Sequence, residues 1–196
     1  VTIDIDMQHV FEARKQLNET SEVKISFNDI IIKACSTALR RHPQINSSWK
    51  GDTILQHGDV NVAFAVAIDE GLITPVINHS DQKGLVQISR ESKDLAEKAR
   101  NRKLQPEQME GSTFTISNLG MFGIEEFTAI INPPNACIMA VGTIRDVPVV
   151  EDGEIVPGKR MKVTLSSDHR IVDGATAAEF LSTVRNLLEN PLGMLL

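Results

Sequence analysis

One short segment of the sequence concentrates side chains that can exchange protons. Residues 166–174 read Ser-Ser-Asp-His-Arg-Ile-Val-Asp-Gly, so His169 lies between two carboxylates and beside an arginine. A histidine changes its charge close to neutral pH, because its unperturbed pKa is about 6.5. His169 is therefore a candidate general base. We expect it to take a proton from a thiol or a hydroxyl, because the sequence has no group of metal ligands that would indicate an activated water.

The two carboxylates of this segment leave two interpretations open. Asp168 and Asp173 can orient the imidazole, as the acid of a catalytic triad does, or pair with Arg170. They can equally bond backbone amides at the start of the helix that follows. The other histidines do not cluster, and we expect each of them to be solvated or structural; they are His9, His42, His57 and His79.

A second candidate segment is Phe-Thr-Ile-Ser-Asn-Leu-Gly-Met-Phe-Gly at residues 114–123. Taken alone it fits a plain strand end, with a turn capped by Ser117 and Asn118. No Gly-x-Ser-x-Gly elbow surrounds Ser117, which argues against a hydrolase nucleophile. We therefore expect Ser117 to serve as a hydrogen-bond donor to an oxyanion.

Hydrophobic periodicity predicts the elements that must position both segments. His169 is expected between a strand at 161–166 and an amphipathic helix at 175–188, and a capped helix is expected from Ser26 to just before His42. Strands and helices mix without strict alternation, which favours an α/β fold with a mixed sheet and helices on one face, a two-layer sandwich. The remaining expected elements are strands at 1–6, 60–68 (buried on both faces), 114–117 and 136–141, helices at 9–16 and 85–102, and a hairpin at 147–155 turning at Asp152-Gly153.

Composition restricts the functional class. The chain has 196 residues, 41% of them hydrophobic, a net charge of -6 and 4% aromatic residues with no Tyr. This indicates one globular domain at 1–196, without a nucleic-acid platform, and no apolar run is long enough to span a bilayer. Cys35 and Cys137 lie in apolar surroundings, which favours a reducing compartment. The chain opens without Met and without a signal peptide, and we expect it to be part of a longer polypeptide.

Taken together, Asp-His-Arg-Ile-Val-Asp-Gly and Phe-Thr-Ile-Ser-Asn-Leu-Gly resemble the catalytic domain of the 2-oxo acid dehydrogenase acyltransferases. Gly-Leu-Ile-Thr-Pro-Val-Ile at 71–77, Ile-Asn-Pro-Pro at 131–134 and Leu-Glu-Asn-Pro at 188–191 are similar to further landmarks of that family, in the same order. The loop at 117–123 is most similar to the dihydrolipoamide acetyltransferase branch of pyruvate dehydrogenase complexes. The family's usual basic helix before the first strand is absent here, as are lipoyl and subunit-binding domains.

The resemblance implies the fold of chloramphenicol acetyltransferase and a homotrimer that builds a larger cubic or dodecahedral core. Active sites then lie between subunits, in a tunnel entered by coenzyme A from one end and by a lipoyl arm from the other. His169 matches the general base, Ser117 the oxyanion donor of the neighbouring subunit, and Asp173 the acidic position beside the histidine. The resemblance also implies contacts to coenzyme A from Asn118, Ser48, Met121 and Phe122.

The reaction so implied is transfer of an acetyl group from S-acetyldihydrolipoamide to coenzyme A, without a metal. Partners would be a 2-oxo acid decarboxylase and dihydrolipoamide dehydrogenase, held by upstream domains, in a bacterial cytoplasm or a mitochondrial matrix. Alternatives are a branched-chain or succinyl acyltransferase, a scaffold-only core subunit, and a free-standing acetyltransferase of a small hydroxylated molecule. The resemblance implies that scaffold-only relatives lose the catalytic histidine, so the presence of His169 argues against a scaffold-only role.

Overall fold

The fold is organised around one mixed β-sheet of six strands, in the order β1-β10-β9-β8-β4-β7. The computed structural model describes residues 1–69 and 71–195. Strands β8 and β9 run parallel, as do β4 and β8, while the pairs β1–β10, β10–β9 and β4–β7 are antiparallel. The sheet strands are β1 (Thr2–Asp6), β4 (Val62–Phe64), β7 (Val76–Ile77), β8 (Phe114–Asn118), β9 (Cys137–Glu151) and β10 (Glu154–Ser167).

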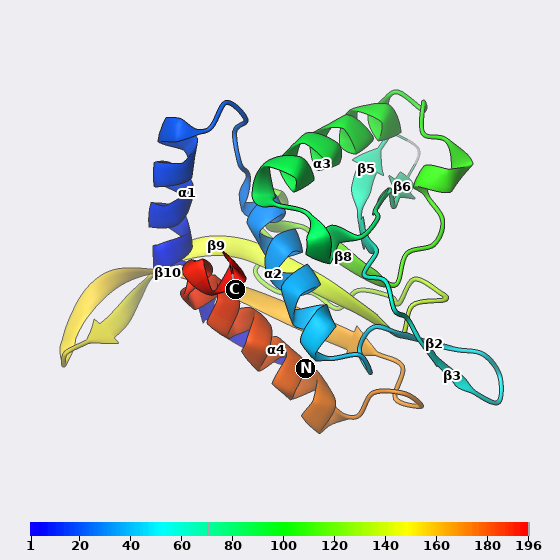
Figure 1. Cartoon of the computed structure of the whole chain (residues 1–196). Helices are drawn as coiled ribbons and strands as arrows, with labels where there is room; N and C mark the ends of the chain where they lie inside the picture. The colour runs from blue at the N-terminus through cyan, green and yellow to red at the C-terminus, as the bar shows by residue number, and fades with distance from the viewer. Residues whose placement is uncertain (70, 196) are drawn as a thin grey trace.

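Four α-helices cover one face of this sheet, with α2 and α4 lying side by side across it (Figure 1). This arrangement confirms the mixed-sheet α/β sandwich expected from the sequence. The helices are α1 (Gln8–Thr20), α2 (Phe27–Arg41), α3 (Leu85–Arg100) and α4 (Gly174–Glu189). The smaller elements are β2 (Ser47–Trp49) paired with β3 (Ile54–Gln56), β5 (Val66–Ile68) paired with β6 (Gly71–Ile73), and the 3₁₀ helices η1 (Ser80–Gln82), η2 (Pro106–Gln108), η3 (Gly120–Phe122) and η4 (Pro191–Leu195).

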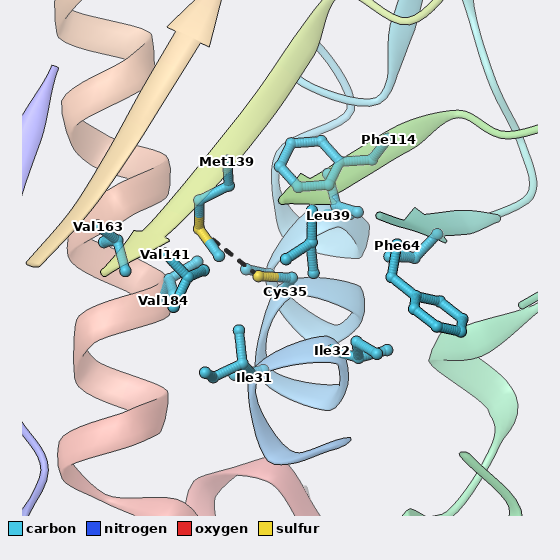
Figure 2. Packing of buried hydrophobic residues seen from close by; sticks show 14 of the residues in the cluster. Ile31, Ile32, Cys35, Leu39, Phe64, Phe114, Met139, Val141, Val163 and Val184 are labelled. Atoms are coloured by element: carbon cyan, nitrogen blue, oxygen red, sulfur yellow. Dashed lines mark hydrogen bonds between the residues drawn. The ribbon is translucent and has the colours of Figure 1, made fainter. Parts of the chain in front are cut away.

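A single apolar core fills the space between the helices and the sheet. Figure 2 shows Ile31, Cys35 and Leu39 of α2 facing Met139 and Val141 of β9, with the Cys35 thiol 3.8 Å from the Met139 sulfur. Alternate residues of each sheet strand enter this core, and the others therefore point to the opposite face. On β8 the core residues are Phe114 and Ile116, which places Thr115 and Ser117 on the face away from the helices.

Local sequence signals fix two of the helices. The Ser26 hydroxyl accepts a hydrogen bond from the Asp29 amide, and the Asp29 carboxylate accepts one from the Ser26 amide, which completes the capping box of α2. Helix α2 ends at Arg41, as expected, and α4 matches its expected range within one residue at each end. Helix α1 continues to Thr20, four residues beyond the expected end, and α3 stops two residues short at Arg100.

One strand prediction was wrong. The expected strand at 60–68 divides into β4 and β5, which belong to different sheets, and Ala67 is exposed instead of buried. The expected strand at 136–141 and the expected hairpin at 147–155 are both confirmed, as parts of the long strands β9 and β10, which project from the body as a hairpin (Figure 1). The predicted turn is correct: Asp152 and Gly153 have φ of 49° and 86°, the geometry that Asp-Gly favours in a two-residue hairpin turn.

Candidate active site

His169 lies in a tight turn between the end of β10 and the start of α4. The Asp168 carbonyl accepts hydrogen bonds from the amides of Ile171 and Val172, at 2.9 and 3.0 Å, and this closes the turn around the histidine. The Asp168 amide donates to the Ala136 carbonyl at 2.8 Å, which ties the turn to the segment that enters β9. The His169 side chain itself is exposed, so the turn presents it to solvent in the single chain.

The two neighbours of His169 form an ion pair around it. The Arg170 guanidinium donates to both carboxylate oxygens of Asp168, with Nη2–Oδ2 and Nε–Oδ1 distances of 2.6 and 2.9 Å, and the Arg170 amide donates to Oδ1 at 3.1 Å. These bonds hold the pKa of Asp168 below its usual value. The guanidinium carbon also lies 4.8 Å from the centre of the Trp49 ring, within cation–π range.

A hollow of about 340 Å³ adjoins this turn. Apolar and polar side chains from three distant parts of the chain meet there, because backbone hydrogen bonds join β2 to residue 136 and residue 136 to the turn. The lining residues are Trp49, Ile131, Pro133, Pro134, Asn135, Asp168 and Arg170. The Ile-Asn-Pro-Pro landmark was predicted from the sequence alone, and only the tertiary structure brings it and Trp49 beside the turn that carries His169.

Asp173 occupies the N-cap of α4. Its Oδ1 accepts a hydrogen bond from the Thr176 amide at 2.8 Å, and bonds of this kind hold the pKa of Asp173 below its usual value, with a further small contribution from His169. The cap is the second of the two interpretations that the sequence left open for this residue. Its carboxylate is nevertheless close enough to His169 for the two groups to interact electrostatically.

Ser117 lies near the end of β8, half-buried on the sheet face that the helices leave free. It is opposite Ala140 of β9, which is opposite Thr164 of β10, so Ser167 lies three residues further along the sheet. Standard strand spacings then give a distance of about 14 Å between the Cα atoms of Ser117 and Ser167, and His169 lies beyond Ser167. The register therefore separates Ser117 from the end of β10, where the turn that carries His169 begins.

The loop after Ser117 contains three of the expected coenzyme A contacts, and their surroundings differ; they are Asn118, Met121 and Phe122. The Asn118 side chain is bonded within the chain, with its Oδ1 accepting from the Gly120 amide at 2.9 Å and its Nδ2 donating to Asn28 Oδ1 at 3.1 Å. Met121 and Phe122 of η3 are 81% and 61% exposed. Asn118 thus holds the turn in place, and Met121 and Phe122 are free to meet another molecule.

Ser48, the remaining expected contact, is fully buried on β2. Its hydroxyl lies 2.7 Å from Nε2 of His57, just after β3, so the pair links the two strands of that hairpin. Burial, with a smaller effect of Lys50, holds the pKa of His57 below its usual value. A contact between Ser48 and coenzyme A stays a prediction.

The segment between η3 and β9 crosses the free face of the sheet next to Ser117. The Thr143 amide donates to the Ile124 carbonyl at 2.8 Å, and Glu125 forms ion pairs with Arg145 and Lys162. At Gly142 an added Cβ would lie 2.0 Å from the Glu125 carbonyl oxygen, so only glycine permits this approach. This close contact was not predicted, because its only signal is one glycine inside an otherwise apolar strand.

Within residues 1–69 and 71–195, no group of three or more His, Cys, Asp or Glu side chains is arranged to hold a metal ion. Over the same residues, the helices are too short or too polar to traverse a lipid bilayer.

Comparison with known proteins gives consistent matches over the whole chain. The family model of the 2-oxoacid dehydrogenases acyltransferase (catalytic domain) matches residues 1–196. A similar relative is the mitochondrial dihydrolipoyllysine-residue acetyltransferase component of the pyruvate dehydrogenase complex of Schizosaccharomyces pombe, 50% identical over all of this chain. The chain covers 42% of that relative's length, so it corresponds to less than half of such a protein.

Solved structures agree with this match. The dihydrolipoamide acetyltransferase of Azotobacter vinelandii, studied for the roles of a serine, a histidine and an asparagine in catalysis, has a TM-score of 0.94 at 35% identity, over 100% of this chain and 83% of that one. The cubic core of the pyruvate dehydrogenase multienzyme complex gives the same values. Chloramphenicol acetyltransferase shares the fold, with a TM-score of 0.65 at 13% identity over 96% of this chain and 86% of that one. The chain belongs to the family of 2-oxoacid dehydrogenase acyltransferase catalytic domains.

Proposed function

We propose that this chain transfers an acetyl group from S-acetyldihydrolipoamide to coenzyme A, as the core of a pyruvate dehydrogenase complex. One observation carries the assignment of residues. In the Azotobacter vinelandii enzyme the serine lies 52 positions before the histidine, and the asparagine four positions after it. In this chain Ser117 lies 52 positions before His169, and Asp173 lies four positions after it. The third position differs in charge, since this chain has a carboxylate there.

The sheet register supports a site shared between subunits. Within one chain the strand spacings put the Cα atoms of Ser117 and Ser167 about 14 Å apart, and His169 follows Ser167 in the turn. We infer that a common substrate meets the histidine of one subunit and the serine of its neighbour. The similar cubic core is a multi-subunit assembly. We therefore infer a homo-oligomer. Family membership further supports a homotrimer as its smallest unit, and a cubic or dodecahedral core built from such trimers.

His169 acts as the general base in this mechanism. It takes the proton of the coenzyme A thiol while the sulfur attacks the acetyl carbonyl, and a tetrahedral intermediate with a negative oxygen forms. The intermediate expels the dihydrolipoamide sulfur, which receives the proton back from the imidazole. A thiol of pKa about 8.5 and a histidine of about 6.5 leave full ionisation about 2.7 kcal/mol uphill, and a positioned base commonly contributes about 10²–10⁴-fold.

Ser117 donates a hydrogen bond to the negative oxygen of this intermediate. Removal of such a donor commonly costs about 2.7–4 kcal/mol. No covalent enzyme intermediate is needed, since the nucleophile belongs to the second substrate. Alignment of both long thiol arms end to end in one tunnel supplies the proximity effect.

The exposed side chains of Met121 and Phe122 suit contacts with the coenzyme A arm. We extend the proposal to the partners: a 2-oxo acid decarboxylase and dihydrolipoamide dehydrogenase, recruited through lipoyl and subunit-binding domains outside this chain. The compartment is the mitochondrial matrix or the bacterial cytoplasm, since both kinds of source occur among the similar proteins.

Acetyl transfer from S-acetyldihydrolipoamide to coenzyme A by the full-length protein tests the proposal. We expect His169→Ala to lower turnover by several orders of magnitude and Ser117→Ala by about 10²–10³-fold, with little change in coenzyme A affinity. His79→Asn is the matched control, because His79 is exposed and has a left-handed backbone that Asn tolerates. Near-normal turnover of His169→Ala would refute the mechanism, and a loss confined to binding would make Ser117 a contact residue.

Donor choice separates the alternative activities. Transfer rates measured with succinyl, branched-chain acyl and acetyl-dihydrolipoamide show which acyl group the protein prefers. Acetylation of a small hydroxylated acceptor, with lipoamide inert, would instead indicate a free-standing acetyltransferase. A core that assembles but transfers no acyl group would indicate a scaffold.

A further inference from the structure

We propose that the Asp168–Arg170 ion pair positions His169 and removes the charge of Asp168 from its surroundings, so that the imidazole works beside a neutral pair. This inference rests on the proposed role of His169 as the base. It adds two positioning residues, Arg170 and Trp49, that act on the histidine without contacting the reacting atoms.

The geometry of the pair fixes the turn from both sides of the histidine. Asp168 and Arg170 flank His169 in sequence, and the guanidinium holds both carboxylate oxygens, so the peptide units around the histidine are clamped. The Arg170 amide also donates to the same carboxylate. A bidentate arginine–carboxylate pair has a defined orientation that a lysine cannot reproduce. The turn is therefore held in one conformation by the residues on each side of the base.

Trp49 packs against the arginine of the Asp168–Arg170 ion pair. The Arg170 guanidinium lies 4.8 Å from the centre of the Trp49 ring, and 60% of the Arg170 side chain is exposed with this contact in place. An exposed arginine has many alternative conformations, and stacking on an aromatic ring from β2 restricts them. Trp49 also lines the hollow beside the turn, so it connects the clamp with the surface where a substrate arm can lie.

The bonding pattern favours the pairing of Asp168 with Arg170 over a role as the acid of a triad. Both of its oxygens accept hydrogen bonds from Arg170, and its side chain is 20% exposed. The charged groups closest to the histidine along the chain are Asp168 and Arg170 of its own turn and Asp173 at the start of α4. The neighbouring elements present Trp49 of β2, followed by Lys50, and the 131–135 segment, which has no ionisable side chain. If Arg170 is lost, the carboxylate next to His169 is no longer neutralised.

The test measures the pH dependence of His169 modification, which does not require acetyl transfer. Diethyl pyrocarbonate acylates unprotonated imidazole, and mass spectrometry of the peptide that contains His169 gives the rate at each pH for the full-length protein. We expect Arg170→Gln to shift the half-maximal rate upward by about 0.5–1 pH unit, because an unpaired carboxylate stabilises the protonated ring. Asp168→Asn should shift it downward, and the double variant should return it close to wild type.

Two further variants separate charge from geometry. Arg170→Lys keeps the positive charge but loses the bidentate hydrogen bonds to Asp168. The pH midpoint of His169 modification should therefore stay near wild type, while kcat for acetyl transfer falls with little change in KM. Arg40→Gln breaks an arginine–carboxylate ion pair elsewhere, with Asp81, and should change neither reading. Opposite shifts in the single variants with cancellation in the double support the proposal. Equal-sign shifts, or no shift, overturn it, and they do so even if the wild type fails to transfer acetyl groups.

Discussion

The change Asp173→Asn distinguishes a helix cap from a catalytic acid at the position four residues after the base. In the structure Asp173 Oδ1 accepts the Thr176 amide at 2.8 Å, and asparagine offers the same acceptor atom. Asp and Asn are about equally good N-caps, while Ala at this position costs about 0.5–2 kcal/mol. We therefore expect the unfolding free energy to change by a few tenths of a kcal/mol in Asp173→Asn and to fall by about 1 kcal/mol in Asp173→Ala.

The expected activities follow from the same contact. Loss of one exposed charge near His169 should change the acetyl-transfer rate by no more than about five-fold, because water screens such an interaction to within about 1 kcal/mol. An acid that fixes the tautomer of a catalytic histidine behaves differently, since its replacement by the amide costs about 10⁴-fold in a serine protease. The assays are acetyl transfer at saturating substrates and urea unfolding at one fixed protomer concentration.

A fall of 10³-fold or more in the acetyl-transfer rate of Asp173→Asn, with unchanged unfolding, would refute a role of Asp173 as a helix cap alone. Such a result would show that the carboxylate charge, and not the cap, is what the reaction needs. The Azotobacter vinelandii enzyme has an asparagine four positions after its histidine. We therefore expect Asp173→Asn to keep most of the acetyl-transfer activity.

Two further expectations concern the surroundings of the site. Gly142→Ala should destabilise the protein by about 1–3 kcal/mol, because its Cβ would lie 2.0 Å from the Glu125 carbonyl oxygen and would displace it. Thermal unfolding measures this loss of stability. Gly58→Ala is the control and should be nearly neutral, because nothing lies within 4 Å of its added Cβ. The pKa of His57 is lowered in the folded chain by burial and by Lys50, so its contribution to stability is present above the unfolded value of about 6.5 and is lost as the pH falls from there through the folded value. Protection of β2 and β3 amides against hydrogen exchange should then decrease between pH 7 and 5, and a His57→Gln variant with the same decrease would contradict this cause.

Short-range signals in the sequence were sufficient for several elements of the fold. The Ser26 cap, the Asp152-Gly153 turn and the apolar spacing of α4 each depend on residues within a few positions of one another, and the structure has each feature where it was expected. The strand at 60–68 failed for the matching reason. Its apolar run does not reveal that β4 joins the main sheet while β5 leaves it to pair with β6, since that choice depends on partners far along the chain.

The sequence by itself determined the family and the two segments with candidate chemistry, because motifs such as Asp-His-Arg-Ile-Val-Asp-Gly are local. Only the tertiary structure decided how these residues are related in space. Register across three strands separates Ser117 from His169 within one chain, and backbone bonds from Ser47 through Ala136 to Asp168 bring Trp49 to Arg170. Distances of this kind depend on strand pairing and packing between residues 23 (Ser117 and Ala140) to 121 (Trp49 and Arg170) positions apart, which no local pattern encodes.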